Sequence, residues 1–488
     1  MTATATRLGG PAVGAAATTP LAPASAVGAL LERGLDQAAR LPADALAVIA
    51  LPAPRAPAAG LWHVDVDADA VLWEPRDDDE AIAGVGTAAE VVATGDDRFA
   101  RAAADGAAVL ARAVAIGDGP AARLFGGLAF VAGGGRDGFG DAWFTWPRWR
   151  YTRRGGAAWL SLTVSPAQAR ERARWHAEHR AAVTALTTAL PSPRARVRAS
   201  HEAPAASWLA YVDEIRAAID DGEVRKVVAA RTRELELAEA ADPAAVLIAL
   251  GLRHPDCTRF GVRRRRVALV GASPERLIRR RGHAIDAEAL AGSIARRGDD
   301  DELRARLLAS AKDRDEHELV VRAIAGTLAP RCAELIVPAV PTVRALRHVL
   351  HLHTPIRGTL RGDDHVLALA GALHPTPAVG GTPTAAAIAR IAAREPDRGW
   401  YAAPVGWFDG DGDGELAVAI RAGVLAGATA RLHAGAGIVR DSDARAELAE
   451  TVVKLRALTG ALGLDGGPGD GDGDDRAGDG ERGGGAGR

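Results

Sequence analysis

The sequence predicts an α+β (mixed α/β) fold, because three of its features occur together between residues 27 and 464. Stretches with helical periodicity alternate with short strand-like runs. Several of these runs are separated only by turn-forming residues, as at the acidic loop 409–414, which indicates β-hairpins. No repeat of fixed period is visible. Helices interleaved with hairpins favour a mixed sheet backed by helical layers over a doubly wound parallel sheet.

The earlier part of this region, residues 27–200, is typical of a scaffold. Helical periodicity covers 28–40 and 166–190, and Ser165 stands where it could cap the second of these helices. We expect strands in three runs of this part, which read LWHVDVD, ARLFGGLAF and AAWLSLTV.

The later part, residues 201–464, holds the denser pattern of helices, strands and chemically useful side chains. A helix is expected over 207–220, where Asp221 and Gly222 stop it, and strands follow at 224–237, 267–271 and 277–288. Two further helices are expected, with two strands between them; the four segments are 302–328, 418–427, 430–437 and 444–462.

The two ends of the chain lack the side chains that a folded core needs. Residues 1–26 are rich in Ala, Thr, Gly and Pro, and residues 465–488 contain no Val, Leu, Ile or aromatic residue. We therefore expect a disordered tail at each end. The acidic spacing in the second tail imitates a calcium loop, but Asp475 replaces the glycine that the loop requires.

Composition excludes several classes of protein. The net charge of −2 gives no global attraction to nucleic acid, and no run of about 18 apolar residues predicts a membrane span. Cys257 and Cys332 are too far apart in the sequence for a zinc site or a redox pair, and two cysteines make no disulfide framework. A cytoplasmic location is the expectation.

Lysine is scarce: of the 60 basic residues, only Lys226, Lys312 and Lys454 are lysine. An arginine guanidinium stays protonated, whereas a buried lysine can lose its proton and act as a base. The three lysines are therefore candidates for work that arginine cannot do.

Two pairs of acidic residues share a helical spacing of three. Asp313 and Glu316 lie on one face of the expected helix 302–328, and Glu447 and Glu450 lie on one face of 444–462. If the two faces meet, four carboxylates converge on a site that suits Mg²⁺. The alternative is a pair of ordinary solvated acidic faces, in which Glu450 and Lys454 form an i,i+4 ion pair.

Other local signals are weaker. The glycines of HAGAGIV, which include Gly437, would let backbone amides approach an anion, but the segment matches neither a P-loop nor GxGxxG. On sequence alone a histidine such as His351 is more often a satisfied sheet histidine than a catalytic one. No GxSxG motif supports a serine hydrolase.

Ten motifs between about 226 and 454 occur in the order found in chorismate-utilising enzymes, and the chain closely resembles isochorismate synthases. The resemblance implies two interlocked subdomains, each a large mixed or antiparallel sheet backed by helices, with the active site between them in a single domain over 27–464. The motifs are VRKVVAAR, GASPERL, ALAGSIARRG, KDRDEHELVV, HLHTPIRGTL, LHPTPAVGGTP, RGWYAAPVGW, VAIRAG, AGAGIV and ELAETVVK.

Moving the hydroxyl of chorismate from C4 to C2 requires a base that activates water and an acid that protonates the leaving group. The resemblance assigns these roles to Lys226 and Glu275. It also assigns Mg²⁺ to Glu316 and Glu450, with Asp313 and Glu447 reaching the ion through water. Substrate contacts are implied for Arg421 and Gly437, which would grip a carboxylate. Further pocket positions match Ser293, His351, Ala378, Tyr401 and Lys454.

Three positions separate the branches of this family. Aminodeoxychorismate synthases carry a nucleophilic lysine where this chain has Ala291, and anthranilate synthases lack the lysine matched by Lys226. Salicylate synthases place threonine where this chain has Ala378. The resemblance thus favours isochorismate formation without pyruvate loss, and no glutamine amidotransferase subunit is expected. A salicylate synthase and a non-catalytic chorismate-binding relative are the alternatives, and either menaquinone or siderophore biosynthesis remains open as the pathway.

Overall fold

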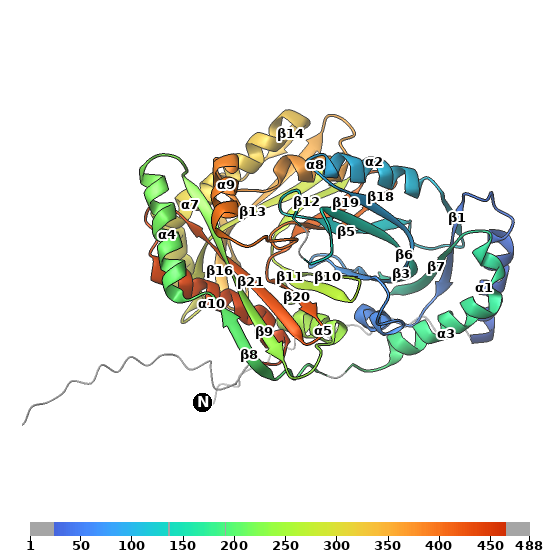
Figure 1. Ribbon diagram of the computed structural model, residues 1–488. Coiled ribbons are helices and arrows are strands. Elements are labelled where there is room, and N and C mark those ends of the chain that lie inside the picture. Colours follow the sequence, from blue (N-terminus) through green and yellow to red (C-terminus); the bar gives the residue numbers. More distant parts are fainter. Residues whose placement is uncertain (1–23, 135–136, 191, 465–488) are drawn as a thin grey trace, which may run out of the picture.

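The computed structural model describes residues 24–134, 137–190 and 192–464, in which helices cover an extensive network of strands (Figure 1). The α-helices are α1 (Ala24–Ala38), α2 (Arg98–Leu110), α3 (Arg172–Thr187), α4 (Ala205–Asp220), α5 (Pro243–Arg253), α6 (Asp300–Ala309), α7 (Ala311–Leu328), α8 (Val366–Leu373), α9 (Thr384–Arg394) and α10 (Ala444–Ala461). Short 3₁₀ helices are η1 (Ala58–His63), η2 (Gln168–Arg170) and η3 (Ala329–Arg331).

The strands alternate with these helices along the chain. They are β1 (Leu46–Pro52), β2 (Ala70–Glu74), β3 (Ala81–Ala93), β4 (Ala113–Ile116), β5 (Arg123–Leu128), β6 (Ala142–Arg154), β7 (Ala157–Val164), β8 (Val197–Glu202), β9 (Lys226–Leu237), β10 (Thr258–Arg264), β11 (Val267–Ser273), β12 (Arg276–Arg281), β13 (Ala284–Ala295), β14 (Cys332–Ile336), β15 (Thr342–Ala345), β16 (Val349–Leu360), β17 (Gly381–Thr382), β18 (Pro404–Asp409), β19 (Gly414–Val418), β20 (Ala422–Ala426) and β21 (Thr429–Ile438).

Strand β6 is the branch point of the network. One edge of β6 pairs with β3, while its other edge pairs with β5 near Ala142 and with β7 near Arg154. From β5 the pairing continues through β18, β19, β12 and β13 to β16, and from β3 it continues through β2, β10, β11, β20 and β21 to β9. Among the described strands, only β1 and β4 pair in parallel. The α+β class is thus confirmed, with a large and mainly antiparallel sheet. The strands form one hydrogen-bonded network, and a division into two subdomains stays a prediction.

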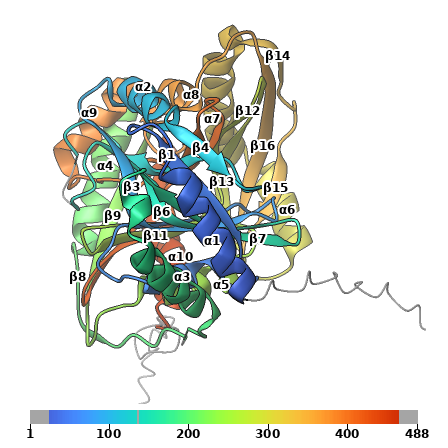
Figure 2. The same cartoon turned by 90° about the vertical axis from the view of Figure 1, so that its right-hand side faces the viewer.

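Helices pack on the outside of this network in separate groups. Figure 1 shows α1 and α3 at one end of the molecule, and Figure 2, in which this end faces the viewer, shows them side by side; the two helices contact each other. At the other end, α4 and α10 lie together (Figure 1). Helix α7 packs on β13 and α10 packs on β21, so the two acidic pairs are carried by helices that pack on different branches of the strand network.

Four elements differ from the sequence expectation. The run LWHVDVD forms no strand, because its first three residues are the last turn of the 3₁₀ helix η1. The expected strand 277–288 is a hairpin of β12 and β13 that turns at Gly282. The expected helix 302–328 is broken at Ser310, whose side chain caps α7. The Ser165 hydroxyl accepts a hydrogen bond from the backbone N–H of Gln168, the first residue of η2, and does not cap α3.

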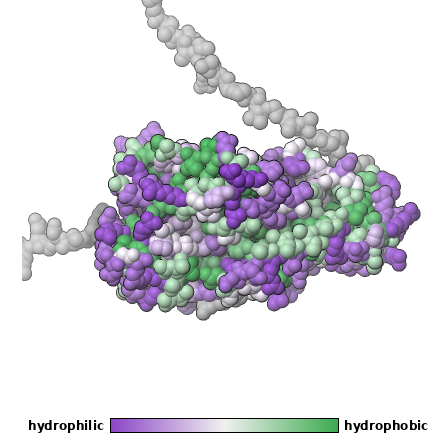
Figure 3. Space-filling model, turned by 90° about the horizontal axis from the view of Figure 1, so that it is seen from above, coloured by the Kyte–Doolittle hydropathy of each residue, from purple (hydrophilic) through white to green (hydrophobic). Residues whose placement is uncertain are grey.

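The ends of the folded region also differ slightly from the sequence expectation. Helix α1 begins at Ala24, inside the expected tail 1–26; the rest of that tail and the tail 465–488 lie outside the described residues. No helix in the described ranges is both long and apolar enough to cross a membrane. From above, hydrophilic and hydrophobic side chains are interspersed on the surface (Figure 3).

Candidate active site

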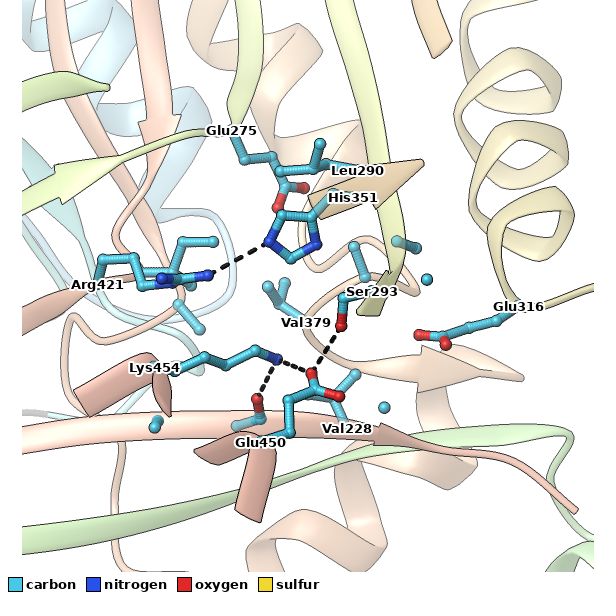
Figure 4. A pocket seen from close by; sticks show the side chains of 18 of the residues that line it. Val228, Glu275, Leu290, Ser293, Glu316, His351, Val379, Arg421, Glu450 and Lys454 are labelled. Atoms are coloured by element: carbon cyan, nitrogen blue, oxygen red, sulfur yellow. Dashed lines mark hydrogen bonds and ion pairs between the residues drawn. The ribbon is translucent and has the colours of Figure 1, made fainter. Parts of the chain in front are cut away.

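One pocket gathers nearly all of the residues that the sequence singled out (Figure 4). Lys226 is the exception, since it lies behind the lining with its Nζ atom 2.9 Å from Oε1 of the lining residue Glu316. The predicted residues that line the pocket are Glu275, Ser293, Asp313, Glu316, His351, Ala378, Tyr401, Arg421, Gly437, Glu447, Glu450 and Lys454.

The lysine side of the site depends on the pairing of β9 with β21. Lys226 is the first residue of β9 and is fully buried, and Val228, two residues further along the strand, pairs with Gly437. A Cβ atom at position 437 would lie 2.5 Å from Oε1 of Glu316 and 2.9 Å from Cε of Lys226. Only glycine therefore leaves room for the lysine and the glutamate to meet.

The acid side has a different character. Glu275 lies between β11 and β12 and is 2% exposed, and no described residue donates a hydrogen bond to its Oε1 atom. Burial raises the pKa of Glu275 to about 8, and the negative charge of Glu288 adds to this effect while Lys226 opposes it. The carboxyl group therefore holds its proton at neutral pH.

Three of the four acids on α7 and α10 pair with a lysine. Glu316 pairs with Lys226, and Oε1 of Glu447 lies 2.9 Å from Nζ of Lys312. Oε1 of Glu450 lies 2.6 Å from Nζ of Lys454 and accepts a hydrogen bond of 2.9 Å from the Ser293 hydroxyl. The three lysines of the chain thus all contact acids of this site, which agrees with the inference drawn from lysine scarcity.

Asp313 is held differently from the other three acids. It accepts hydrogen bonds from the hydroxyl of Ser310 and, at 3.3 Å, from the backbone N–H of Ser293. Ser293 follows a bulge in β13 at Gly292, which has a φ of +71°, and a Cβ atom there would lie 2.9 Å from the carbonyl oxygen of Asp313. The glycine therefore permits the close packing of α7 on β13.

Burial shapes the charges of these acids. The pKa of Asp313 is raised by burial and by the charge of Glu316, although Ser310 opposes the shift. The pKa of Glu447 is raised by burial and by Glu450. Burial alone would also raise the pKa of Glu450, but Lys454 and Ser293 together lower it. Like charges thus crowd the region between α7 and α10.

The donor set fits Mg²⁺ by its chemistry. Within the described ranges no three His, Cys, Asp or Glu side chains form a compact ligand cluster. Mg²⁺ requires no such cluster, because it usually takes one or two carboxylates and keeps several waters. Four carboxylates that line one pocket supply this kind of hard oxygen donor.

The remaining wall combines Arg421, His351 and Tyr401. The Arg421 guanidinium donates to Nε2 of His351 at 3.3 Å, and burial together with this cation holds the pKa of His351 well below its usual range. His351 is therefore neutral. Arg421 adopts a φ of +51°, which is unusual for a residue with a side chain and marks a constrained position. Tyr401 stacks on His433 with ring centroids 4.8 Å apart.

Among the lining residues to which sequence reasoning gave no site role, two are charged. Lys312 belongs to the KDRDEH motif, and its status as one of three lysines was a usable signal. Arg398 is buried and donates to the carbonyl oxygens of Val228 at 2.7 Å and Val379 at 2.8 Å, so it ties β9 to the loop that carries Ala378. Arg398 is the first residue of the RGWYAAPVGW motif, and its place in that motif was a usable signal.

Comparisons with known proteins identify the family of this chain. The sequence pattern of the chorismate binding enzyme family matches residues 35–463. The chain is 38% identical over 264 residues to the salicylate biosynthesis isochorismate synthase of Pseudomonas aeruginosa and 36% identical over 274 residues to the isochorismate synthase MenF of Bacillus subtilis. These alignments cover 53% and 55% of this chain, and the chain spans only 55% and 58% of the length of those relatives.

The structure is also similar to that of MenF, the menaquinone-specific isochorismate synthase of Escherichia coli. The TM-score is 0.75 with 29% sequence identity, and the match covers 90% of this chain and 99% of the other. The chain therefore belongs to the chorismate binding enzyme family.

Proposed function

We propose that the protein is an Mg²⁺-dependent isochorismate synthase, which converts chorismate reversibly to isochorismate by adding water at C2 and losing the C4 hydroxyl. The observation that carries this proposal is that a buried glutamic acid, Glu275, lines the pocket, while a fully buried lysine, Lys226, lies just behind the lining against Glu316. A base and an acid are the two groups that this exchange of hydroxyls requires. Relatives named isochorismate synthase support the same reaction.

Lys226 is proposed to take a proton from the attacking water, and Glu275 to give its proton to the departing hydroxyl. The raised pKa of Glu275 suits this role, because the acid must carry its proton before turnover. In the reverse direction the two groups exchange roles.

The other lining residues are proposed to hold the substrate. Arg421 would bind one carboxylate, since a guanidinium fork matches two oxygens, and the backbone near Gly437 would approach it closely. Ser293, His351, Ala378, Tyr401 and Lys454 would complete the pocket wall.

Glu316 and Glu450 are proposed to hold Mg²⁺ directly, with Asp313 and Glu447 acting through water. When bound, the ion would neutralise the ring carboxylate of chorismate and draw electrons toward C1, which favours attack at C2.

The second candidate is a salicylate synthase, which would go on to eliminate pyruvate. Ala378 argues against it, because the lyases that resemble this chain carry threonine at the matching position. Ala291 likewise lines the pocket where an amine-transferring relative would carry a nucleophilic lysine. Since water is the proposed nucleophile, we expect no amidotransferase subunit. The net charge of −2 predicts no nucleic-acid partner, and the presence of only two cysteines favours a cytoplasmic location.

Product analysis tests the proposal. Purified protein with chorismate and Mg²⁺ should give an equilibrium mixture of chorismate and isochorismate by chromatography, with little salicylate at neutral pH. Pyruvate released in proportion to chorismate consumed would replace the proposal with the salicylate synthase. Unchanged chorismate would favour a non-catalytic binding protein.

A further inference from the structure

A buried carboxylate that the sequence did not single out lies beside the proposed acid. Glu288 on β13 is 6% exposed and receives the side chains of two arginines. Arg344 on β15 donates to its Oε2 atom at 3.0 Å and to its Oε1 atom at 3.2 Å, and Arg76 from the loop after β2 donates to Oε1. Such charge-assisted, bidentate contacts fix a carboxylate firmly.

Both arginines also grip the backbone next to Glu275. Nη1 of Arg76 and Nη1 of Arg344 each donate to the carbonyl oxygen of Pro274, both at 2.9 Å. Pro274 directly precedes Glu275 in the chain. The two guanidinium groups thus bridge Glu288 and the peptide that presents the acid, and Arg76 reaches this place from a position 198 residues earlier.

We infer that Glu288, held by Arg76 and Arg344, is a positioning residue for Glu275: it fixes the backbone of the acid and places a permanent negative charge beside its carboxyl group. This inference rests on the proposed function, in which Glu275 is the general acid. It assigns part of the catalytic machinery to Arg76, which belongs to the part of the chain expected to be scaffold.

The charges around Glu275 determine the direction in which Glu288 shifts its pKa. Glu275 faces Lys226 on β9, Arg344 on β15, Arg76 and Glu288. Burial would raise the pKa of Glu288, but His353 on β16 and the two arginines hold it well below its usual range, so Glu288 stays ionised. A third arginine, Arg276 on β12, is already neutralised by Glu415 at 2.8 Å and by Asp77 at 2.7 Å.

Without the charge of Glu288, Arg76 and Arg344 would act on Glu275 alone and favour its ionised form. The variant Glu288→Gln removes that charge and keeps the shape of the side chain. Its effect on Glu275 can be followed in two ways: by the pH at which the rate falls, and by infrared difference spectra of the protonated carboxyl group. The infrared band of Glu275 is identified by its loss in Glu275→Gln, and it reports the titration without any turnover.

In Glu288→Gln, we expect both midpoints to move to lower pH by about one unit or more, which is the usual scale for a neighbouring charge. Glu288→Asp keeps the charge and should restore the midpoint toward that of the wild type. Arg344→Gln removes a positive charge and should move the midpoint the opposite way, to higher pH. Glu80→Gln is the matched control, because Glu80 is also buried and paired, with Arg123 at 2.7 Å, but does not act on Glu275.

A Glu288→Gln enzyme that is slower at every pH but keeps the wild-type midpoint would overturn the inference, since a purely structural role would produce that result. If Glu288→Gln does not fold, an unchanged midpoint in Arg344→Gln would overturn it instead. A wild-type protein that makes no isochorismate would contradict the proposed function, and the infrared titration would still decide whether Glu288 acts on Glu275.

Discussion

The two buried ionisable groups proposed for catalysis, Lys226 and Glu275, have different surroundings. Lys226 is fully buried and its Nζ atom lies 2.9 Å from the carboxylate of Glu316, whereas Glu275 is equally buried and forms no ion pair in the described part of the chain. A carboxyl group that is buried without a donor keeps its proton. The protonation state of Glu275 is therefore set by burial and by fixed charges. Lys226, in contrast, shares its partner Glu316 with the proposed metal site.

This difference predicts that removal of Mg²⁺ affects the side with Lys226 and Glu316 more than the side with Glu275. Removing the metal with EDTA should reduce turnover to background, because the crowded acids would face a dianionic substrate without a cation, and added Mg²⁺ should restore it. The pH at which Glu275 loses its proton should change little. Full activity after exhaustive chelation, measured by chromatography, would show that the enzyme does not require Mg²⁺. Full activity in the variant Glu450→Ala would show that Glu450 is not a Mg²⁺ ligand.

Substitution of the base tests the lysine side. Lys226→Ala should lower the rate by about 10²-fold or more, the usual scale for a positioned proton-transfer group. Lys226→Arg should fail nearly as badly, because a guanidinium keeps its proton at any relevant pH. Steady-state rates in both directions should fall together, since both pass through the same transition state. An active Lys226→Arg enzyme would show that position 226 supplies only charge.

Substitution of the acid tests the other side. Glu275→Gln keeps the volume of the side chain but has no proton to give to the departing hydroxyl, so the rate should again fall by about 10²-fold or more. Chorismate binding, measured by calorimetry, should be affected far less than turnover. A variant that loses binding but keeps turnover at saturating substrate would show that Glu275 holds the substrate rather than protonating it.

The pH dependence sharpens the comparison further. The pKa of Glu275 is raised to about 8, so the carboxyl group is protonated below that pH and ionised above it. Because the protonated form is the active one, the forward rate should fall as the pH rises through about 8. A rate that stays constant well above pH 8 would contradict the acid role of Glu275.

The smallest effect is expected at the helix that carries Glu316. The Ser310 side chain caps α7 by accepting a hydrogen bond of 3.3 Å from the backbone N–H of Asp313. Ser310→Ala should lower the free energy of unfolding by about 1 kcal/mol. Denaturant titration measures this change, with Ser165→Ala as a control at the short helix η2. An unchanged unfolding free energy would show that the cap adds nothing to α7.

The sequence predicted those elements whose pattern is local. Strand β7 and helix α10 fall almost where periodicity put them, because alternation and helical spacing are properties of a single segment. The break at Ser310 was not predicted, since the acidic and apolar residues on either side continue a helical pattern. The 3₁₀ helix around Trp62 was missed because its burial comes from distant parts of the chain.

The residues of the site also fall into those that the sequence predicts and those that it does not. Residues in ordered motifs, such as Glu275 and Glu450, could be identified from the sequence, and the structure brings them to one pocket. Arg76 could not, because its contact with the peptide before Glu275 joins residues 198 positions apart and an arginine in an arginine-rich chain carries no signal. Charge networks that close across the fold become visible only in three dimensions.

The origin of the new hydroxyl tests the central claim most directly. If Lys226 activates water for attack at C2, the reaction run in water enriched in the heavy oxygen isotope should give isochorismate with the label in its C2 hydroxyl, as mass spectrometry of the product would show. Isochorismate that carries no label would mean that the hydroxyl migrates within the substrate, and the assignment of Lys226 and Glu275 as base and acid would be wrong.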